Sequence, residues 1–227
     1  MRKVVAGLLF LTALLAGGDV AFRLWSESVM AERVDEALGL PRRPEVDLHG
    51  FPFALQVLRS RFDRVEVEME GLQPGGLELA AVRLDLRDVR FPRGRLFGPG
   101  PGTVRAATGT GSLEVTDEAF TEYVRARGFG LTVTFAGPEV RAGAIVSVAG
   151  VQTDVEATST LEVEDGVLAF HPEEIEVGGG VEVPLDVITF RVPLPQPVPG
   201  VTLDRLTVED GTARLTGDIE NLTFRLR

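Results

Sequence analysis

The chain has 227 residues, of which 44% are apolar and 25% charged, and it contains no cysteine and only two histidines. This length and composition predict a globular chain with a real core, and the lack of cysteine excludes disulfide frameworks and thiolate metal sites. The formal net charge of −11 argues against nucleic acid as a partner, because that binding depends on neutralising phosphates. It also disfavours electrostatic docking on anionic lipid, so any contact with lipid must rest mainly on apolar side chains.

Residues 1–18 have the pattern of an export segment. A basic start is followed by an almost wholly apolar run from Val4 to Gly18, which is shorter than the roughly twenty residues of a membrane span. Small residues stand just before Asp19, where a signal peptidase requires them. Two interpretations stay open, a signal peptide cleaved after Gly18 and an uncleaved membrane anchor from Val4 to Phe22. In both, the remainder of the chain is exported, and residues 19–227 are predicted to form a single domain.

Amphipathic helices are predicted at three places in the exported part. The first covers Asp19–Leu38, where apolar residues recur at steps of four or five until Gly39 ends the pattern. A second, short helix is expected at Phe53–Arg59, directly after a Phe-Pro pair. The third runs from Asp117 to Arg127, with Thr116 or Asp117 as its N-cap.

Most of the remaining sequence alternates between apolar and polar residues, which predicts long antiparallel strands. The predicted strands cover residues 65–70, 77–86, 131–135, 140–148, 151–163, 167–177, 181–192, 201–208 and 212–226. A change of phase at Ala80-Ala81 predicts a β-bulge, and Asp165-Gly166 and Asp210-Gly211 predict hairpin turns. A one-sided sheet must cover its apolar face. The predicted class is therefore α+β, a long, strongly curved antiparallel sheet wrapped around the amphipathic helices.

Two stretches interrupt the alternation. Gly94–Gly111 is rich in Gly, Pro and Thr and is predicted to form a mobile loop. Prolines at every second position from Pro193 to Pro199 predict an extended crossing that forms few ladder hydrogen bonds. A ligand for a proline-reading domain is the alternative interpretation of that second stretch.

No catalytic arrangement of residues emerges from the sequence. There is no G-x-S-x-G elbow, and His49 and His171 both stand in turn-like sequence. Asp63 or Glu173-Glu174 could supply a general acid and base, but most carboxylates alternate with apolar residues, as on a solvated face. We therefore expect no enzyme activity, no metal site and no cofactor.

The apolar residues include thirteen Phe against one Trp and one Tyr. They could form an ordinary core or line a tubular cavity for acyl chains, where each buried methylene would contribute about 0.8 kcal/mol. The candidate lipid-binding residues are Phe51, Phe53, Leu55, Gln56, Leu58 and Phe62 around the second helix, Phe120, Tyr123 and Val124 on the third, and Phe135, Phe170 and Phe190 on strands. Among these, Gln56 is the candidate for orienting a head group.

The run Val46–Leu58, Val-Asp-Leu-His-Gly-Phe-Pro-Phe-Ala-Leu-Gln-Val-Leu, resembles the G-F-P-F-L-x-Q signature of the LmeA-like phospholipid-binding proteins of actinobacteria. The mid-chain helix at Val115–Val124 and Leu194-Pro195 before the last hairpin agree with it, and Ala54 departs from it where the signature has Leu. The resemblance implies an exported, cell-envelope protein that binds phospholipid. It also implies an elongated tubular lipid-binding (TULIP-like) fold.

Together these features predict a non-enzymatic cell-envelope protein that holds phospholipid acyl chains in an apolar cavity, for lipid transfer or presentation during envelope or lipoglycan assembly. The expected partners are phospholipid, a membrane surface or N-terminal anchoring, and an envelope-assembly enzyme. One alternative is a scaffold for an envelope glycosyltransferase, whose apolar interior is simply core. Another is a hydrolase of envelope glycan with two facing carboxylates. Changing Phe53 and Leu58 together to Asp is expected to abolish lipid retention while the strands stay folded.

Overall fold

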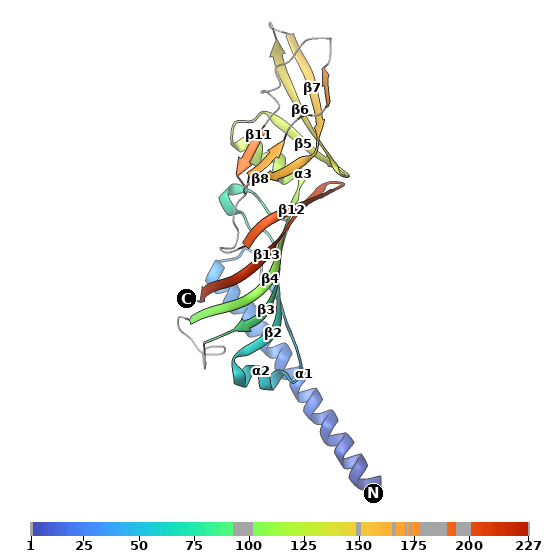
Figure 1. The fold of residues 1–227 in the computed structure, drawn as a ribbon, viewed down its shortest axis with the longest axis vertical. Helices are drawn as coiled ribbons and strands as arrows, with labels where there is room; N and C mark the ends of the chain where they lie inside the picture. Colours follow the sequence, from blue (N-terminus) through green and yellow to red (C-terminus); the bar gives the residue numbers. More distant parts are fainter. Residues whose placement is uncertain are drawn as a thin grey trace. The chain divides into compact units, whose positions relative to one another are not determined.

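The computed structural model describes residues 2–92, 102–148, 151–164, 167–170, 172, 174–177, 190–193 and 201–226. Figure 1 shows its helices and strands coloured along the chain. The chain divides into two compact units, one formed by residues 1–69, 83–109 and 219–227 and the other by residues 70–82 and 110–218. That residues 19–227 act as a single lipid-binding domain stays a prediction.

The first unit packs helices against a sheet (Figure 1). Its helices are α1 (Arg2–Leu38) and α2 (Phe53–Arg59), and its strands are β1 (Glu45–His49), β2 (Arg61–Met69) and β3 (Ala81–Arg90), with parts of β4 (Gly102–Thr116) and β13 (Thr212–Leu226). Helix α1 contacts β1 and α2, and α2 contacts β2. Strands β1 and β2 pair antiparallel with Leu48 opposite Val65, and both of these side chains are buried.

The sheet with the most strands among the described residues has six, in the order β1-β2-β3-β4-β13-β12, where β12 is Val201–Glu209. Its strands alternate as the sequence predicts, but the alternation changes phase within several of them. In β2 the buried positions step from Phe62 to Val65, in β3 from Leu86 to Val89, and in β13 from Ile219 to Leu222. Because neighbouring side chains of a strand point to opposite faces, a step of three residues places the later buried positions out of phase with the earlier ones.

The second unit contains α3 (Asp117–Ala126) and two further sheets. Strands β5 (Leu131–Ala136), β6 (Glu139–Val148), β7 (Val151–Ser159) and β10 (Glu174–Val177) form a sheet of order β10-β7-β6-β5, and β8 (Leu161–Glu164), β9 (Val167–Phe170) and β11 (Phe190–Pro193) form one of order β11-β9-β8. All the described pairs in these two sheets are antiparallel. A short 3₁₀ turn, η1 (Pro74–Gly76), also belongs to this unit. The coarse prediction of an α+β chain dominated by antiparallel strands is confirmed.

Helices are confirmed at the three predicted places, with two differences in their bounds: the first begins at Arg2 and the third ends at Ala126. Helix α2 has the predicted bounds, and α3 begins as predicted, with the hydroxyl of Thr116 accepting a hydrogen bond from Ala119 N at 3.2 Å. The predicted export segment and first amphipathic helix are one continuous helix, α1. Among the residues that the structure describes, none of the helices combines the length and the apolar character needed to cross a membrane.

One predicted strand begins later than expected. It starts as β3 at Ala81, and just before it Leu79 N donates to Leu72 O and Ala80 N to Glu114 O of β4, so the bulge at Ala80-Ala81 stays a prediction. The predicted loop is wrong over residues 102–111, which belong to β4. One of the three glycines of β4 that favoured a loop, Gly109, serves close packing: a Cβ there would lie 2.5 Å from Asp85 O on β3.

The hairpin turn at Asp210-Gly211 is confirmed, and Gly211 has the positive φ of 73° that such a turn requires. The second predicted turn, Asp165-Gly166, lies outside the described residues, as does most of the proline-rich crossing. The predicted strand at 151–163 is divided into β7 and β8, and the one at 167–177 into β9 and β10.

Replacing Gly109 by Ala should destabilise the protein by about 1–3 kcal/mol, because the new methyl group would press on backbone that cannot rotate away. Urea unfolding measures this change in the free energy of unfolding. Gly130→Ala is the matched control, because no atom lies within 4 Å of a Cβ at that position. Equal stability of the two variants would contradict the close approach of β4 to β3.

Candidate functional site

The Gly-Phe-Pro-Phe signature forms the entry to α2, and its glycine is explained by one close contact. Gly50 has a φ of 118°, and a Cβ at this position would lie 2.2 Å from Nε2 of Gln56. The side chain of Gln56, the last residue of the G-F-P-F-L-x-Q signature, therefore fills the space beside Gly50, the first residue. Between them, the Phe51-Pro52 peptide bond is cis, and Phe53 turns its ring into the core with 1% exposure.

Gln56 connects α2 to the neighbouring strand. Its Oε1 accepts a hydrogen bond from Asp63 N of β2 at 2.9 Å, and the residue is 8% exposed. Within the described residues, its Nε2 is buried and has no hydrogen-bond partner. Gln56 also lines a hollow of about 320 Å³ with Phe51 and Arg59. The structure thus gives Gln56 a positioning role, and its contact with a head group stays a prediction.

Asp19, which stands at the edge of the predicted export segment, caps the start of helix α2. Helix α2 begins after Pro52 and has no capping side chain of its own. The carboxylate of Asp19 on α1 accepts hydrogen bonds from Phe53 N and Ala54 N, each at 2.8 Å. A carboxylate there satisfies free backbone donors and interacts favourably with the positive end of the helix dipole. No local pattern could have revealed it, because donor and acceptor are far apart in the sequence.

A row of aromatic rings links both helices to the sheet in the first unit. Phe22 of α1 lies 5.9 Å from Trp25 and 5.5 Å from Phe53, measured between ring centroids. Phe53 in turn lies 5.6 Å from Phe62, and Phe62 lies 5.4 Å from Phe91. Since Phe53 and Phe62 are almost fully buried, the middle of this aromatic row is packed core.

The other predicted residues around α2 lie on the surface. Phe51 is 76% exposed, Leu58 81% and Leu55 39%, so an amphipathic helix with only one buried apolar side turns these residues outward. Helix α1, which contacts α2, exposes more large apolar side chains. We call this set the α1–α2 apolar surface, and it consists of Val20, Leu24, Trp25, Phe51, Leu55 and Leu58. Ile145 is the one large exposed apolar residue elsewhere among the described residues.

The second unit buries the predicted aromatic residues of α3. Phe120 lies 6.3 Å from Tyr123 and 6.0 Å from Phe135 of β5, again between ring centroids. Tyr123 is covered by the guanidinium of Arg127, 3.4 Å from the ring centroid, and Val124 is fully buried. These residues belong to the second unit, whereas the set around α2 belongs to the first.

The two remaining predicted residues belong to the three-stranded sheet. Phe170 of β9 is fully buried, and its backbone lies opposite that of Phe190 in β11. The side chain of Phe190 lies outside what the structure describes. Contact of any of the predicted residues with lipid stays a prediction.

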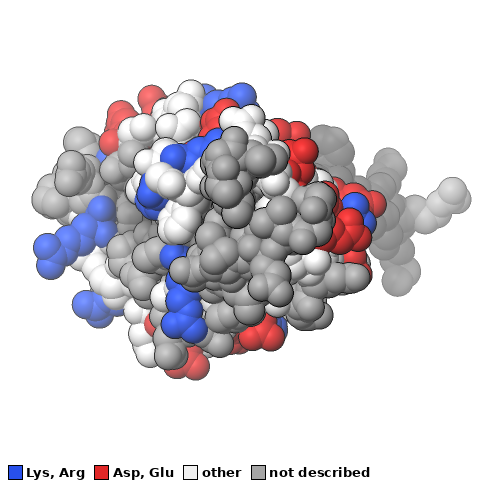
Figure 2. Space-filling view, turned by 90° about the horizontal axis from the view of Figure 1, so that it is seen from above, with Lys and Arg blue, Asp and Glu red and all other residues white. Residues whose placement is uncertain are grey.

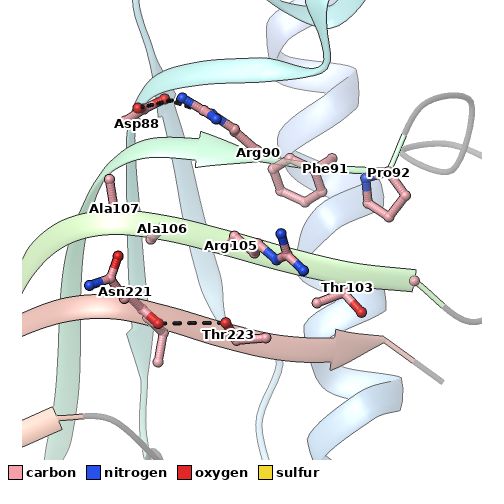
Figure 3. Close-up of a pocket in the computed structure, with 12 residues that line it drawn as sticks. Asp88, Arg90, Phe91, Pro92, Thr103, Arg105, Ala106, Ala107, Asn221 and Thr223 are labelled. Atoms are coloured by element: carbon pink, nitrogen blue, oxygen red, sulfur yellow. Dashed lines mark hydrogen bonds and ion pairs between the residues drawn. The ribbon is translucent and has the colours of Figure 1, made fainter.

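The ends of β3, β4 and β13 enclose a hollow of about 550 Å³ (Figure 3). The side chain of Arg105 lies on β4 between Phe91, just after β3, and Thr223 of β13. Arg90 Nη2 donates to Asp88 Oδ2 at 3.1 Å. This hollow is not predicted from the sequence, because Arg105 stands within the segment that was predicted as a loop.

The charged residues of the strands are mostly paired with one another. Arg64 donates to Asp85 at 2.9 Å, and this hydrogen bond is the main reason why the pKa of Arg64 is raised. His49 Nε2 lies 3.1 Å from Glu66 Oε1. On the face drawn in Figure 2, basic and acidic side chains are interspersed. Among the described residues there is no group of three or more metal-ligating side chains.

Comparison with known proteins gives one match. The model of a family described as LmeA-like phospholipid-binding matches residues 17–218, which include most of both units. No curated protein and no solved structure is significantly similar to the chain.

Changing Asp19 to Ala should destabilise α2 by about 1 kcal/mol, because Phe53 N and Ala54 N would lose their acceptor. Hydrogen exchange of these two amides measures the effect directly. Asp19→Asn should restore protection at only one of the two amides, because each carboxylate oxygen of Asp19 accepts one of the hydrogen bonds and asparagine keeps a single acceptor oxygen. Asp35→Ala, on the same helix but without such a contact, is the control. Unchanged protection in Asp19→Ala would contradict the capping role.

Proposed function

The chain belongs to the LmeA-like phospholipid-binding family, and on this premise we propose that it is an exported cell-envelope protein that binds phospholipid acyl chains and transfers or presents them during envelope assembly. The observation that carries the proposal is the family match over residues 17–218. The signature around α2 supports it, because its residues hold a helix that presents apolar side chains to the outside.

In this proposal the α1–α2 apolar surface contacts the membrane from which lipid is taken. Phe51 and Leu58 are the most exposed of its side chains, and inserting a residue of this size into an apolar layer contributes about 1.5–3 kcal/mol. Trp25, which stacks on Phe22, adds the aromatic type that favours the membrane–water interface. With a net charge of −11, the chain depends on such apolar contacts for membrane binding.

We further propose a curved, TULIP-like sheet around the helices, with acyl chains between sheet and helix. The features that support this proposal lie within single strands and at contacts between neighbouring strands. In β3 and β13 the change of phase coincides with a left-handed residue, Asp88 and Asn221, and irregularities of this kind can bend a strand. Glycines also permit close strand approach: a Cβ at Gly217 of β13 would lie 1.8 Å from Thr202 O on β12. Acyl chains would then have to displace side chains of the packed aromatic row.

Export is part of the same proposal and rests on the pattern of residues 1–18. Both forms, a cleaved signal peptide and an uncleaved anchor, leave Asp19 in the chain, so both keep the cap of α2. The protein would act in a periplasm-like space or on the outer face of the plasma membrane. An envelope-assembly enzyme would receive or use the lipid.

The second candidate function is a non-enzymatic scaffold for an envelope glycosyltransferase. One observation favours it, the complete burial of Phe53 and Phe62 without space between them. In that case the apolar interior is only core, and the α1–α2 apolar surface binds a protein.

Changing Phe51 and Leu58 together to Asp should reduce the rate at which the protein extracts labelled phospholipid from vesicles by at least about tenfold, because two apolar membrane contacts are lost. Phe53 is left unchanged, since its burial against Phe22 and Phe62 means that Asp there would disrupt the core.

Ile145→Asp is the control, because Ile145 is 70% exposed and lies in the second unit. It should leave the extraction rate unchanged. If the double variant extracts lipid as fast as this control, the α1–α2 apolar surface is not the membrane contact. Stoichiometric capture of a membrane enzyme by a chain that extracts no lipid would favour the scaffold.

A further inference from the structure

Two residues with irregular backbone line the hollow at the ends of β3, β4 and β13. Asp88 in β3 has a φ of 50° and Asn221 in β13 a φ of 54°, and both line the hollow. Left-handed backbone at residues other than glycine is uncommon and costs about 1 kcal/mol or more, and such residues concentrate at functional sites. Each also coincides with the change of phase in its strand, between Leu86 and Val89 in β3 and between Ile219 and Leu222 in β13.

The polar side of the hollow carries an excess of positive charge. Arg90 is paired with Asp88, which also binds Arg61. In the described part of the chain, the guanidinium of Arg105 has neither a hydrogen bond nor an ion pair, and Arg105 is exposed. Two arginines and one aspartate thus line a pocket in a chain whose net charge is −11. Since no carboxylate among the described residues neutralises Arg105, its guanidinium is available for an anionic ligand, and phosphate suits the fork of its donors.

The other side of the hollow is apolar and joins the core. Phe91 lines the hollow and also packs edge-on against Phe62, as the last ring of the aromatic row. Pro92 and Leu222 lie beside it, and Leu222 is buried. A volume of about 550 Å³ is within the usual range for small-molecule sites. The hollow therefore offers donors for an anion next to an apolar wall, which is the arrangement that an amphiphilic phosphate ester needs.

We propose that this hollow binds the phosphate group of an amphiphilic phosphate ester, with Arg105 as the main donor, Arg90 as the second, and Phe91 as the wall against which the hydrocarbon lies. Asp88 positions Arg90 and Arg61 and keeps the local charge from exceeding what one phosphate can balance. The inference rests on the proposed function, since a phospholipid is the ligand of this chemistry that the family binds. A soluble phosphate ester shares the same chemistry, and the two sources are separated by experiment.

The test measures binding to the full chain by isothermal titration calorimetry with three probes: dioctanoylphosphatidylglycerol, dioctanoylglycerol without phosphate, and glycerol 3-phosphate without acyl chains. In Arg105→Gln, binding of the phospholipid should weaken about tenfold, as expected for the loss of one charge-assisted hydrogen bond. Binding of dioctanoylglycerol should not change. Arg87→Gln is the matched control, because Arg87 is an exposed arginine of β3 that does not line the hollow.

Each outcome decides one point. If Arg105→Gln and Arg90→Gln bind the phospholipid as tightly as Arg87→Gln does, the phosphate site is wrong while the proposed function stands. If the unaltered chain binds no dioctanoylphosphatidylglycerol, the proposed function itself fails. If glycerol 3-phosphate binds as tightly as the phospholipid and depends on Arg105 in the same way, the anion site is supported and its ligand is a soluble phosphate ester. Equal melting temperatures of the variants show that folding is not the cause.

Discussion

The carboxylate of Asp19 holds together the part of the molecule on which the functional account depends. Helix α2 is short and starts after a proline, so its first backbone donors have no local acceptor. Asp19 provides one from α1, while Glu27 on the same helix accepts from Leu48 N of β1 at 3.0 Å. Two carboxylates thus fix α1 to α2 and to the sheet edge. The signature glycine and Gln56 then complete the attachment of α2 to β2.

This attachment allows an acidic chain to expose apolar side chains on α1 and α2, which we propose contact lipid. On α1, Asp19 and Glu27 accept backbone hydrogen bonds, and on the strands several carboxylates pair with arginines such as Arg64 and Arg83. Phe53 anchors α2 in the core and leaves Phe51 and Leu58 outside. At the other end of the aromatic row, Phe91 lies beside two arginines. In our account, the α1–α2 apolar surface contacts the membrane, and the hollow beside Phe91 binds a phosphate group.

The sequence predicted what depends on local patterns and missed what depends on distant contacts. Helix α3 was found because its cap, Thr116, and its apolar face are local, and the turn at Asp210-Gly211 because it is a short-range signal. Gly109 was misread because glycine is typical both of loops and of closely packed strands. The exposure of Leu58 and the burial of Phe53 could not be separated by periodicity in so short a helix. The hollow at Arg105 depends on irregular residues of two strands far apart in the chain.

Native mass spectrometry combined with lipid extraction, on the chain purified without detergent, tests the binding of phospholipid most directly. The account predicts adducts at phospholipid masses, and the extracted lipids would identify the head group. A polypeptide that carries no lipid, and that stays bare after incubation with phospholipid vesicles, would contradict it.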